Sequence, residues 1–144
     1  MDIRLSAQEL ARRTELVDNA RALIARNFSI EDSDEASLSL SWDGFYLQVS
    51  FSHLYSMLII YLAKHIERPV NAKRLRLLNE INLRSVLGSH AVNSYVGCYT
   101  FRLAYWLDSE LTASRFFEIL GRCTKEARKA YDRLSRKYSF LNSS

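Results

Sequence analysis

Apolar residues recur along this chain with two different periods, and the changes of period divide it into expected helices and strands. Three segments show the spacing of three to four residues that marks one face of an α-helix. We expect helices from Ala7 to Arg26, from Ala72 to Arg84 and from Ala113 to Lys137. Their apolar stripes consist of Leu10, Val17, Ala20 and Ile24 in the first, Leu75, Leu78 and Ile81 with Asn82 in the second, and Phe116, Leu120, Cys123, Ala127, Ala130 and Leu134 in the third.

Each expected helix begins with the same arrangement of residues. A polar N-cap residue can accept a hydrogen bond from a free backbone N–H of the first turn. The expected caps are Ser6, Asn71 and Thr112. An apolar residue before each cap faces another after it, as in a hydrophobic staple. The pairs are Leu5 with Leu10, Val70 with Leu75, and Leu111 with Phe116. In the first helix Glu9 follows the cap by three residues and completes a capping box.

The stretch SLSLSWDGFYLQVSF, between the first two helices, has a period of two residues and predicts a β-hairpin. Asp43-Gly44 is a favoured two-residue turn. Folding the chain about it pairs Trp42 with Phe45, Leu40 with Leu47, and Leu38 with Val49, all on one face. Ser39, Ser41, Tyr46 and Gln48 then share the other face. A slip of one residue would invert both faces, so the pattern fixes the register.

Two further segments complete the expected sheet. MLIIYLA, from Met57 to Ala63, is apolar on both sides, as expected of a central strand. GSHAVNSYVGCYTFRLAYWL predicts a second hairpin with its turn near Val96-Gly97. The element order is α-β-β-β-α-β-β-α. We therefore expect a single α+β domain over residues 1–144, with a five-stranded antiparallel sheet and helices packed mainly on one face.

Two asparagines stand near the end of the second expected helix, in the stretch LLNEINLRS. Asparagine is a weak helix former whose side chain can bond free carbonyls or the amides of a following segment. We therefore expect Asn79 and Asn82 to tie this helix to the strand that begins near Gly88. A ligand-binding role for the two side chains is the alternative.

The order of these segments, with LLNEINLRS before the second hairpin and LTASRFFEIL opening the last helix, resembles the YbjN family. Members of that family are described as bacterial sensory transduction regulators. The resemblance covers residues 6–135, and its most specific part is Leu78-Asn79 with Ile81-Asn82. It implies a fold similar to class I type III secretion chaperones and a homodimer that binds a partner segment. It implies no ligand, cofactor or catalytic residue.

The charge of the chain is uneven, with a formal net charge of +4. Residues 1–68 carry 7 Lys and Arg against 10 Asp and Glu, whereas residues 69–144 carry 13 against 6. Class I secretion chaperones are usually acidic, so the positive charge is a departure from them. The stretch RCTKEARKAYDRLSRKY holds much of it and predicts a solvated helix face, or alternatively a surface for nucleic acid or acidic partners.

Two absences bear on localisation. No apolar run approaches the roughly 20 residues that a membrane span requires. The charged start, MDIRLSAQEL, lacks the apolar core of a secretory signal. We therefore expect a cytoplasmic protein that does not engage a membrane.

The chain lacks the residue patterns of common catalytic and cofactor sites. Its four glycines, Gly44, Gly88, Gly97 and Gly121, are isolated and form no phosphate loop. The histidines, His53, His65 and His90, have no metal-ligand spacing and are expected in loops or at strand edges. Residues 31–35, EDSDE, lack the glycine and final glutamate of a calcium loop and predict a solvated connection. Cys98 and Cys123 are expected to be buried reduced thiols, with a redox pair as the alternative. We expect no enzyme, no cofactor and no metal site.

The most informative candidate surface is the second face of the sheet. Alternation places on it Tyr46, Ile59, Tyr61, Arg102 and Trp106. Aromatic residues and arginine are typical anchors of protein interfaces, so we expect a partner-binding or self-association face. The alternatives are that a helix covers this face, or that it stacks single-stranded nucleic acid beside the basic helix. The predicted function is a non-enzymatic, protein-binding regulator or chaperone-like adaptor.

Overall fold

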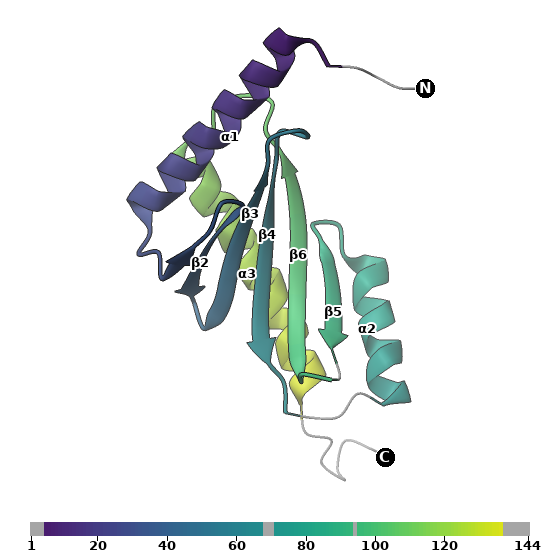
Figure 1. Cartoon of the computed structure of the whole chain (residues 1–144). Coiled ribbons are helices and arrows are strands. Elements are labelled where there is room, and N and C mark those ends of the chain that lie inside the picture. Colours follow the sequence, from purple (N-terminus) through teal and green to yellow (C-terminus); the bar gives the residue numbers. More distant parts are fainter. Residues whose placement is uncertain (1–4, 68–70, 94, 137–144) are drawn as a thin grey trace.

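The computed structural model describes residues 5–67, 71–93 and 95–136, and these form three helices around one sheet (Figure 1). The elements are α1 (Ala7–Asn27), β1 (Asp32–Ser33), β2 (Ser37–Trp42), β3 (Phe45–Ser52), β4 (Met57–His65), α2 (Ala72–Arg84), β5 (Ser89–Asn93), β6 (Cys98–Trp106) and α3 (Ala113–Ser135). The α+β class expected from the sequence is therefore confirmed.

The sheet has six strands in the order β1-β2-β3-β4-β6-β5, and all neighbours are antiparallel. The expected five strands are all present, with β4 in the centre. The added strand, β1, lies in the acidic stretch that was expected to be a solvated connection. It pairs Asp32 with Ser39 and Ser33 with Leu38. Both β1 residues are polar and exposed, so no hydrophobic alternation could have indicated this pairing.

The register of the first hairpin matches the prediction at every expected pair, from Trp42 with Phe45 to Leu38 with Val49. The turn residues Asp43 and Gly44 have positive φ values of 52° and 84°. A two-residue turn with positive φ at both positions follows the right-handed twist of the strands. Local turn chemistry and the hydrophobic pattern thus specify the same pairing.

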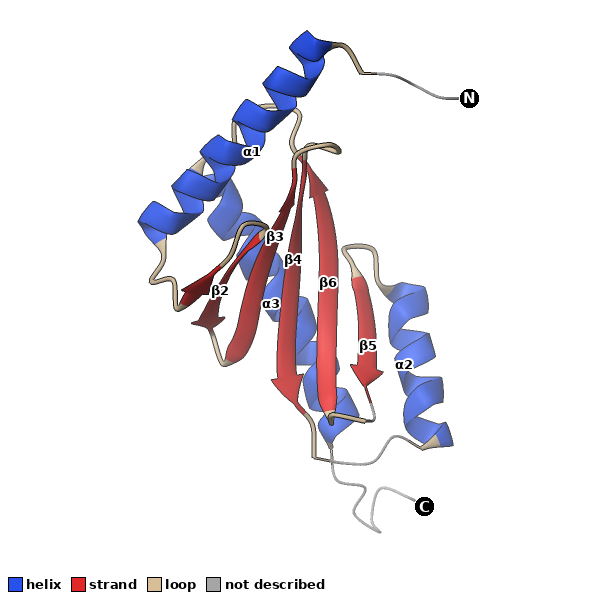
Figure 2. Ribbon diagram, viewed as in Figure 1, coloured by secondary structure: helices blue, strands red, loops and turns tan. Residues whose placement is uncertain are grey.

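The core lies between one face of the sheet and α3, which crosses behind the strands in Figure 2. All six residues of the expected α3 stripe are buried. They pack against inward-facing strand residues, among them Leu47, Ile60, Leu62 and Phe101. α1 lies across the end of the sheet where β3 turns into β4, and α2 lies beside the edge strand β5 (Figure 1). The opposite face of the sheet carries no described helix.

The helix starts are those expected from the sequence. The side chains of Ser6, Asn71 and Thr112 each accept a hydrogen bond from the backbone N–H three residues later. Two details differ from the prediction: α1 continues to Asn27, and α3 is helical to Ser135. Val70 and Lys137, which the sequence placed in a staple and at a helix end, lie outside the described residues.

Two apolar positions assigned to helix stripes are not in the core. Leu10 is 39% exposed and Leu75 is 52% exposed. Both lie in the first turn or so of their helices, where α1 and α2 extend past the neighbouring strands. Leu16, which the stripe omitted, is buried in α1. The period of a helix predicts its apolar side, but the length over which that side is covered depends on its neighbours.

Candidate functional site

The uncovered face of the sheet holds the five residues predicted to form a partner-binding surface. Tyr46 and Trp106 are 48% and 57% exposed, and Arg102 is also exposed. Ile59 and Tyr61 are partly buried on β4 between them. Register places Tyr61 opposite Arg102, and Ile59 opposite Ala104. These side chains come from three neighbouring strands and form one continuous surface, called here the open face.

The open face is hollowed at the end where β4 stops and the β5–β6 turn begins. This hollow has a volume of about 390 Å³, and its walls include Tyr46, His65, Val96 and Cys98. Of these residues only Tyr46 had been assigned to the candidate surface. His65 and Cys98 face each other across β4 and β6, in phase with Tyr61 and Arg102. Extending the period of two along the strands would have found them.

Hydrogen bonds fix the polar side chains at the β2 side of the open face. The Tyr46 hydroxyl donates to Ser39 Oγ at 3.0 Å, and Gln48 Nε2 donates to Ser37 Oγ at 3.2 Å. Burial, with a smaller effect of Cys98, raises the pKa of Tyr61 above its ordinary value. Its hydroxyl therefore stays protonated at neutral pH and remains a donor. The face presents aromatic rings with ordered polar tips rather than a charged surface.

The two cysteines lie on opposite sides of the sheet, which excludes the redox pair. Cys98 is partly buried and belongs to the open face, whereas Cys123 is fully buried on α3 beneath the other face. Burial raises the pKa of Cys123 to about 12, so its thiol stays protonated. The expectation of a buried thiol therefore holds for Cys123 and not fully for Cys98.

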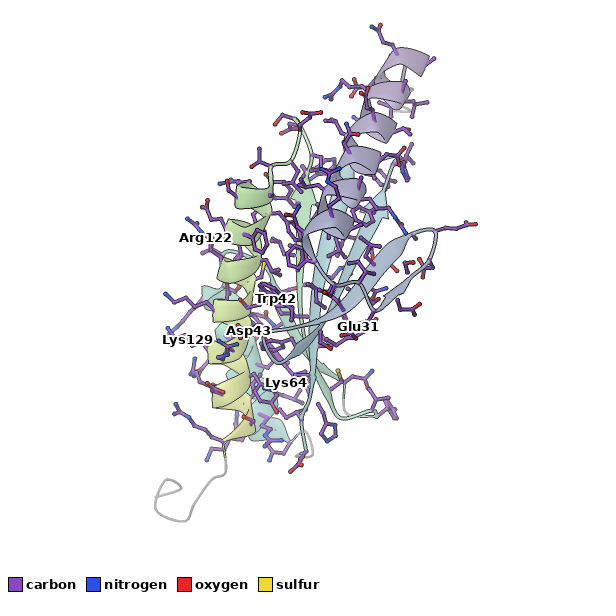
Figure 3. All side chains as sticks on the ribbon, turned by 90° about the vertical axis from the view of Figure 1, so that its left-hand side faces the viewer. Glu31, Trp42, Asp43, Lys64, Arg122 and Lys129 are labelled. Atoms are coloured by element: carbon purple, nitrogen blue, oxygen red, sulfur yellow. The ribbon has the colours of Figure 1, made fainter. Side chains whose placement is uncertain are left out.

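The basic helix and the aromatic surface also lie on opposite sides of the sheet. In Figure 3, Arg122 and Lys129 lie on α3, which packs on the covered side. Arg102 is the only Lys or Arg among the described strand residues that the alternation places on the open face, and Lys64 of β4 also lines the hollow. The arrangement in which a basic helix flanks the stacking surface, as the nucleic-acid alternative required, is not present. Nothing in the geometry favours that alternative.

The two predicted asparagines occupy different environments. Asn82 Nδ2 donates to the carbonyl of His90 at 2.8 Å, and the His90 N–H donates to Asn82 Oδ1 at 2.8 Å. Asn79 is exposed, and its side chain has no hydrogen bond to the other described residues. Asn82 thus makes the helix-to-strand contact expected of the pair, and Asn79 does not.

A buried histidine network lies on the covered side of the sheet and was not expected. His90 lies in the edge strand β5, where the sequence placed it, but the residue is buried and only 3% exposed. Its Nδ1 lies 2.6 Å from the Tyr99 hydroxyl, and its Nε2 lies 3.2 Å from Glu126 Oε1. Burial lowers the pKa of His90, although Glu126 opposes this, and burial raises the pKa of Tyr99. The neutral ring therefore accepts from Tyr99 and donates to Glu126.

This network predicts a pH-dependent stability. Because the folded state lowers the pKa of His90, the unfolded chain binds the proton more readily. The free energy of unfolding is not reduced by His90 protonation above about pH 6.5, the ordinary pKa of histidine. Below that pH the unfolded chain takes up the proton first, and the free energy of unfolding falls by at most about 1.4 kcal/mol per pH unit. Urea unfolding between pH 7.5 and 5.5 should show a smaller loss for His90→Gln than for the wild type. Parallel pH profiles for the two proteins would contradict this.

A second group of exposed apolar side chains lies on and after α2. Leu75, Leu83 and Val86 are 52%, 78% and 99% exposed. Leu75 and Leu83 belong to α2, and Val86 lies in the connection from α2 to β5. These residues provide a second exposed apolar surface, outside the open face. The homodimer implied by the family resemblance stays a prediction.

The described residues lack two features that would bear on chemistry or membrane insertion. They contain no group of three or more His, Cys, Asp or Glu side chains placed to hold a metal ion. None of the helices in this part of the chain is both long and apolar enough to cross a membrane.

Comparison with known proteins identifies the fold. No protein-family profile and no curated protein sequence matches the chain. A chain of the HopA1–SchA chaperone–effector complex matches with a TM-score of 0.56 at 13% identity, over 90% of this chain and 99% of that one. A chain of the complex of the Yersinia pestis type III secretion chaperone SycH with a fragment of YscM2 matches with a TM-score of 0.53 at 13% identity, over 82% of this chain and 98% of that one. YbjN from E. coli matches with a TM-score of 0.55 at 12% identity, over 90% of this chain and 92% of that one. The chain therefore has the YbjN and secretion-chaperone fold that the sequence resemblance implied.

Proposed function

We propose that this protein is a non-enzymatic, chaperone-like adaptor or regulator that binds a segment of another protein on the open face. The observation that carries the proposal is the open face itself, which exposes Tyr46 beside a hollow of about 390 Å³ and Trp106 at the far end of β6. The likeness to a chaperone–effector complex and to a secretion chaperone bound to a protein fragment supports it at the level of the fold.

The chemistry of the open face suits a polypeptide. Exposed rings and one arginine are the residue types that most often carry binding energy in protein interfaces. Large apolar surfaces left in water mark interaction sites more often than they occur without function. The hollow between Tyr46 and Cys98 can receive one apolar side chain of the partner, while Trp106 packs on its backbone or on a second side chain. The partner segment is therefore expected to be apolar or aromatic rather than strongly acidic.

The proposal predicts that Trp106→Asp abolishes partner capture. The tagged protein is used to capture interacting proteins from its native cells, and these are identified by mass spectrometry. Leu75→Asp is the matched control, because Leu75 is about as exposed as Trp106 but lies on α2. One protein should be captured by the wild type and by Leu75→Asp, and lost with Trp106→Asp. With the purified partner, we expect Trp106→Asp to weaken binding about tenfold or more.

The mass of each purified variant is measured alongside, because the same face could also mediate self-association. A wild-type oligomer that becomes monomeric only in Trp106→Asp would make a second copy of the chain the occupant of the open face. Capture of the same proteins by the wild type and both variants, with unchanged masses, would contradict the proposed role of this face.

A further inference from the structure

A cavity of about 440 Å³ lies on the covered side of the sheet, between the end of α2, the start of β5 and α3. This volume falls in the range of about 300–1,000 Å³ that is typical of small-molecule sites. Ile81, Leu87 and Ala130 supply apolar surface to its walls. The sheet and its core separate it from the open face, so its occupant is distinct from the proposed protein partner.

Three cations line the same cavity: Arg84 at the end of α2, and Lys129 and Arg133 on α3. Lys129 and Arg133 are four residues apart on one helix face, where like charges repel each other. Within the described ranges, none of the three cations has an ion pair or a hydrogen bond to another residue. Their positive charge is therefore not neutralised by an ion pair with any described residue.

The one carboxylate in the cavity wall is held away from these cations. Glu126 accepts from His90 Nε2 and forms a short contact with the Ser85 hydroxyl. Glu126 is three residues before Lys129, a spacing at which the two could pair on the helix surface. It faces the histidine network instead. With His90 neutral, three cations and one carboxylate leave the lining with a formal charge of +2.

We propose that this cavity binds a small organic phosphate monoester. Its phosphate lies among Arg84, Lys129 and Arg133, and its carbon skeleton packs against the apolar walls. A phosphate monoester carries a charge between about −1.5 and −2 at neutral pH and three strong acceptor oxygens, which matches the excess charge and the three cationic side chains. Arginine can bind two phosphate oxygens at once, and lysine adds a point charge. The contacts of the Glu126 carboxylate with the neutral His90 ring and with the Ser85 hydroxyl hold it in place, so it does not pair with these cations.

The proposal is tested by calorimetric titration with phenyl phosphate at constant ionic strength. We expect binding to the wild type that is tighter than that of inorganic phosphate, because the ring is buried against the apolar walls. Lys129→Gln and Arg133→Gln should each weaken phenyl phosphate binding about tenfold or more. Lys125→Gln, which removes an exposed positive charge from the same helix outside the cavity, should leave it within about twofold. Trp106→Asp should also leave it unchanged.

Circular dichroism establishes that each variant is folded, and Arg84→Gln provides a variant on a second element if an α3 substitution perturbs the helix. A short peptide with one phosphoserine is titrated in parallel, because a protein can supply the same phosphate chemistry. Tighter binding of phenyl phosphate assigns the site to a free small molecule, and tighter binding of the peptide assigns it to a modified protein. Absence of binding, or equal weakening by Lys125→Gln and Lys129→Gln, would overturn the proposal.

Discussion

Replacing Asn82 with leucine is expected to lower the free energy of unfolding by about 2–4 kcal/mol, the cost of leaving two buried backbone groups without partners. The N–H and the carbonyl of His90 both bond to the Asn82 side chain, and His90 lies in β5, the last strand of the sheet. A primary amide has the same donor and acceptor as a peptide group. Asn82 therefore occupies the place of a further strand and covers part of the exposed edge.

Asn79→Leu is the matched control, since it makes the same substitution three residues earlier on the same helix. Asn79 is exposed, so its replacement should change the free energy of unfolding by no more than about 0.5 kcal/mol. Equilibrium unfolding in urea measures both values, and an unchanged m-value would show that the denatured state is comparable. Equal losses for the two variants would refute the edge-capping role of Asn82.

Gly88→Ala is expected to destabilise the protein by about 1–3 kcal/mol, as overpacking does in a close-packed interior. A Cβ atom at this position would lie 2.4 Å from the backbone oxygen of Arg102 and 2.7 Å from Phe101 Cζ. The first of these neighbours is backbone of β6, so the strand pairing would have to shift. Gly88 also accepts a hydrogen bond from Ser85 Oγ at 2.7 Å, which ties the α2–β5 connection together.

The control for this substitution is Gly121→Ala, in the middle of α3. A Cβ atom there would meet nothing within 4 Å, so the space is open. Alanine in an exposed helix interior is more favourable than glycine by roughly 0.5–1 kcal/mol. The two glycine substitutions should therefore change the thermal midpoint in opposite directions. Stabilisation by Gly88→Ala would show that β5 approaches β6 less closely than described.

The open face and the cationic cavity give the molecule two separate sites on opposite sides of one sheet. The former is aromatic and nearly uncharged, whereas the latter is lined by three cations around a fixed carboxylate. Both involve strands of the same sheet, since β6 contributes Arg102 to the open face and its neighbour β5 contributes His90 to the cavity wall. The Trp106 and Lys129 substitutions test the two sites independently.

The sequence by itself determined the elements, their order and most of the register. Helix starts depend on a cap and a few neighbouring residues, and hairpin register depends on turn residues and strict alternation, so both signals are local. The same alternation placed Tyr46, Tyr61 and Trp106 on one face, as the strand register does. It could not indicate β1, whose two residues are polar and pair through their backbone alone.

Only the tertiary structure decided which surfaces are covered and which distant side chains meet. Asn79 and Asn82 are three residues apart on α2. The way this helix packs beside β5 brings only the Asn82 side chain to the backbone of His90. Ser85, His90 and Glu126 come from a loop, a strand and a helix, and Lys129 and Arg133 join them through the packing of α3. No local pattern encodes such a meeting, because the free energy that brings these residues together comes from the burial of the core as a whole.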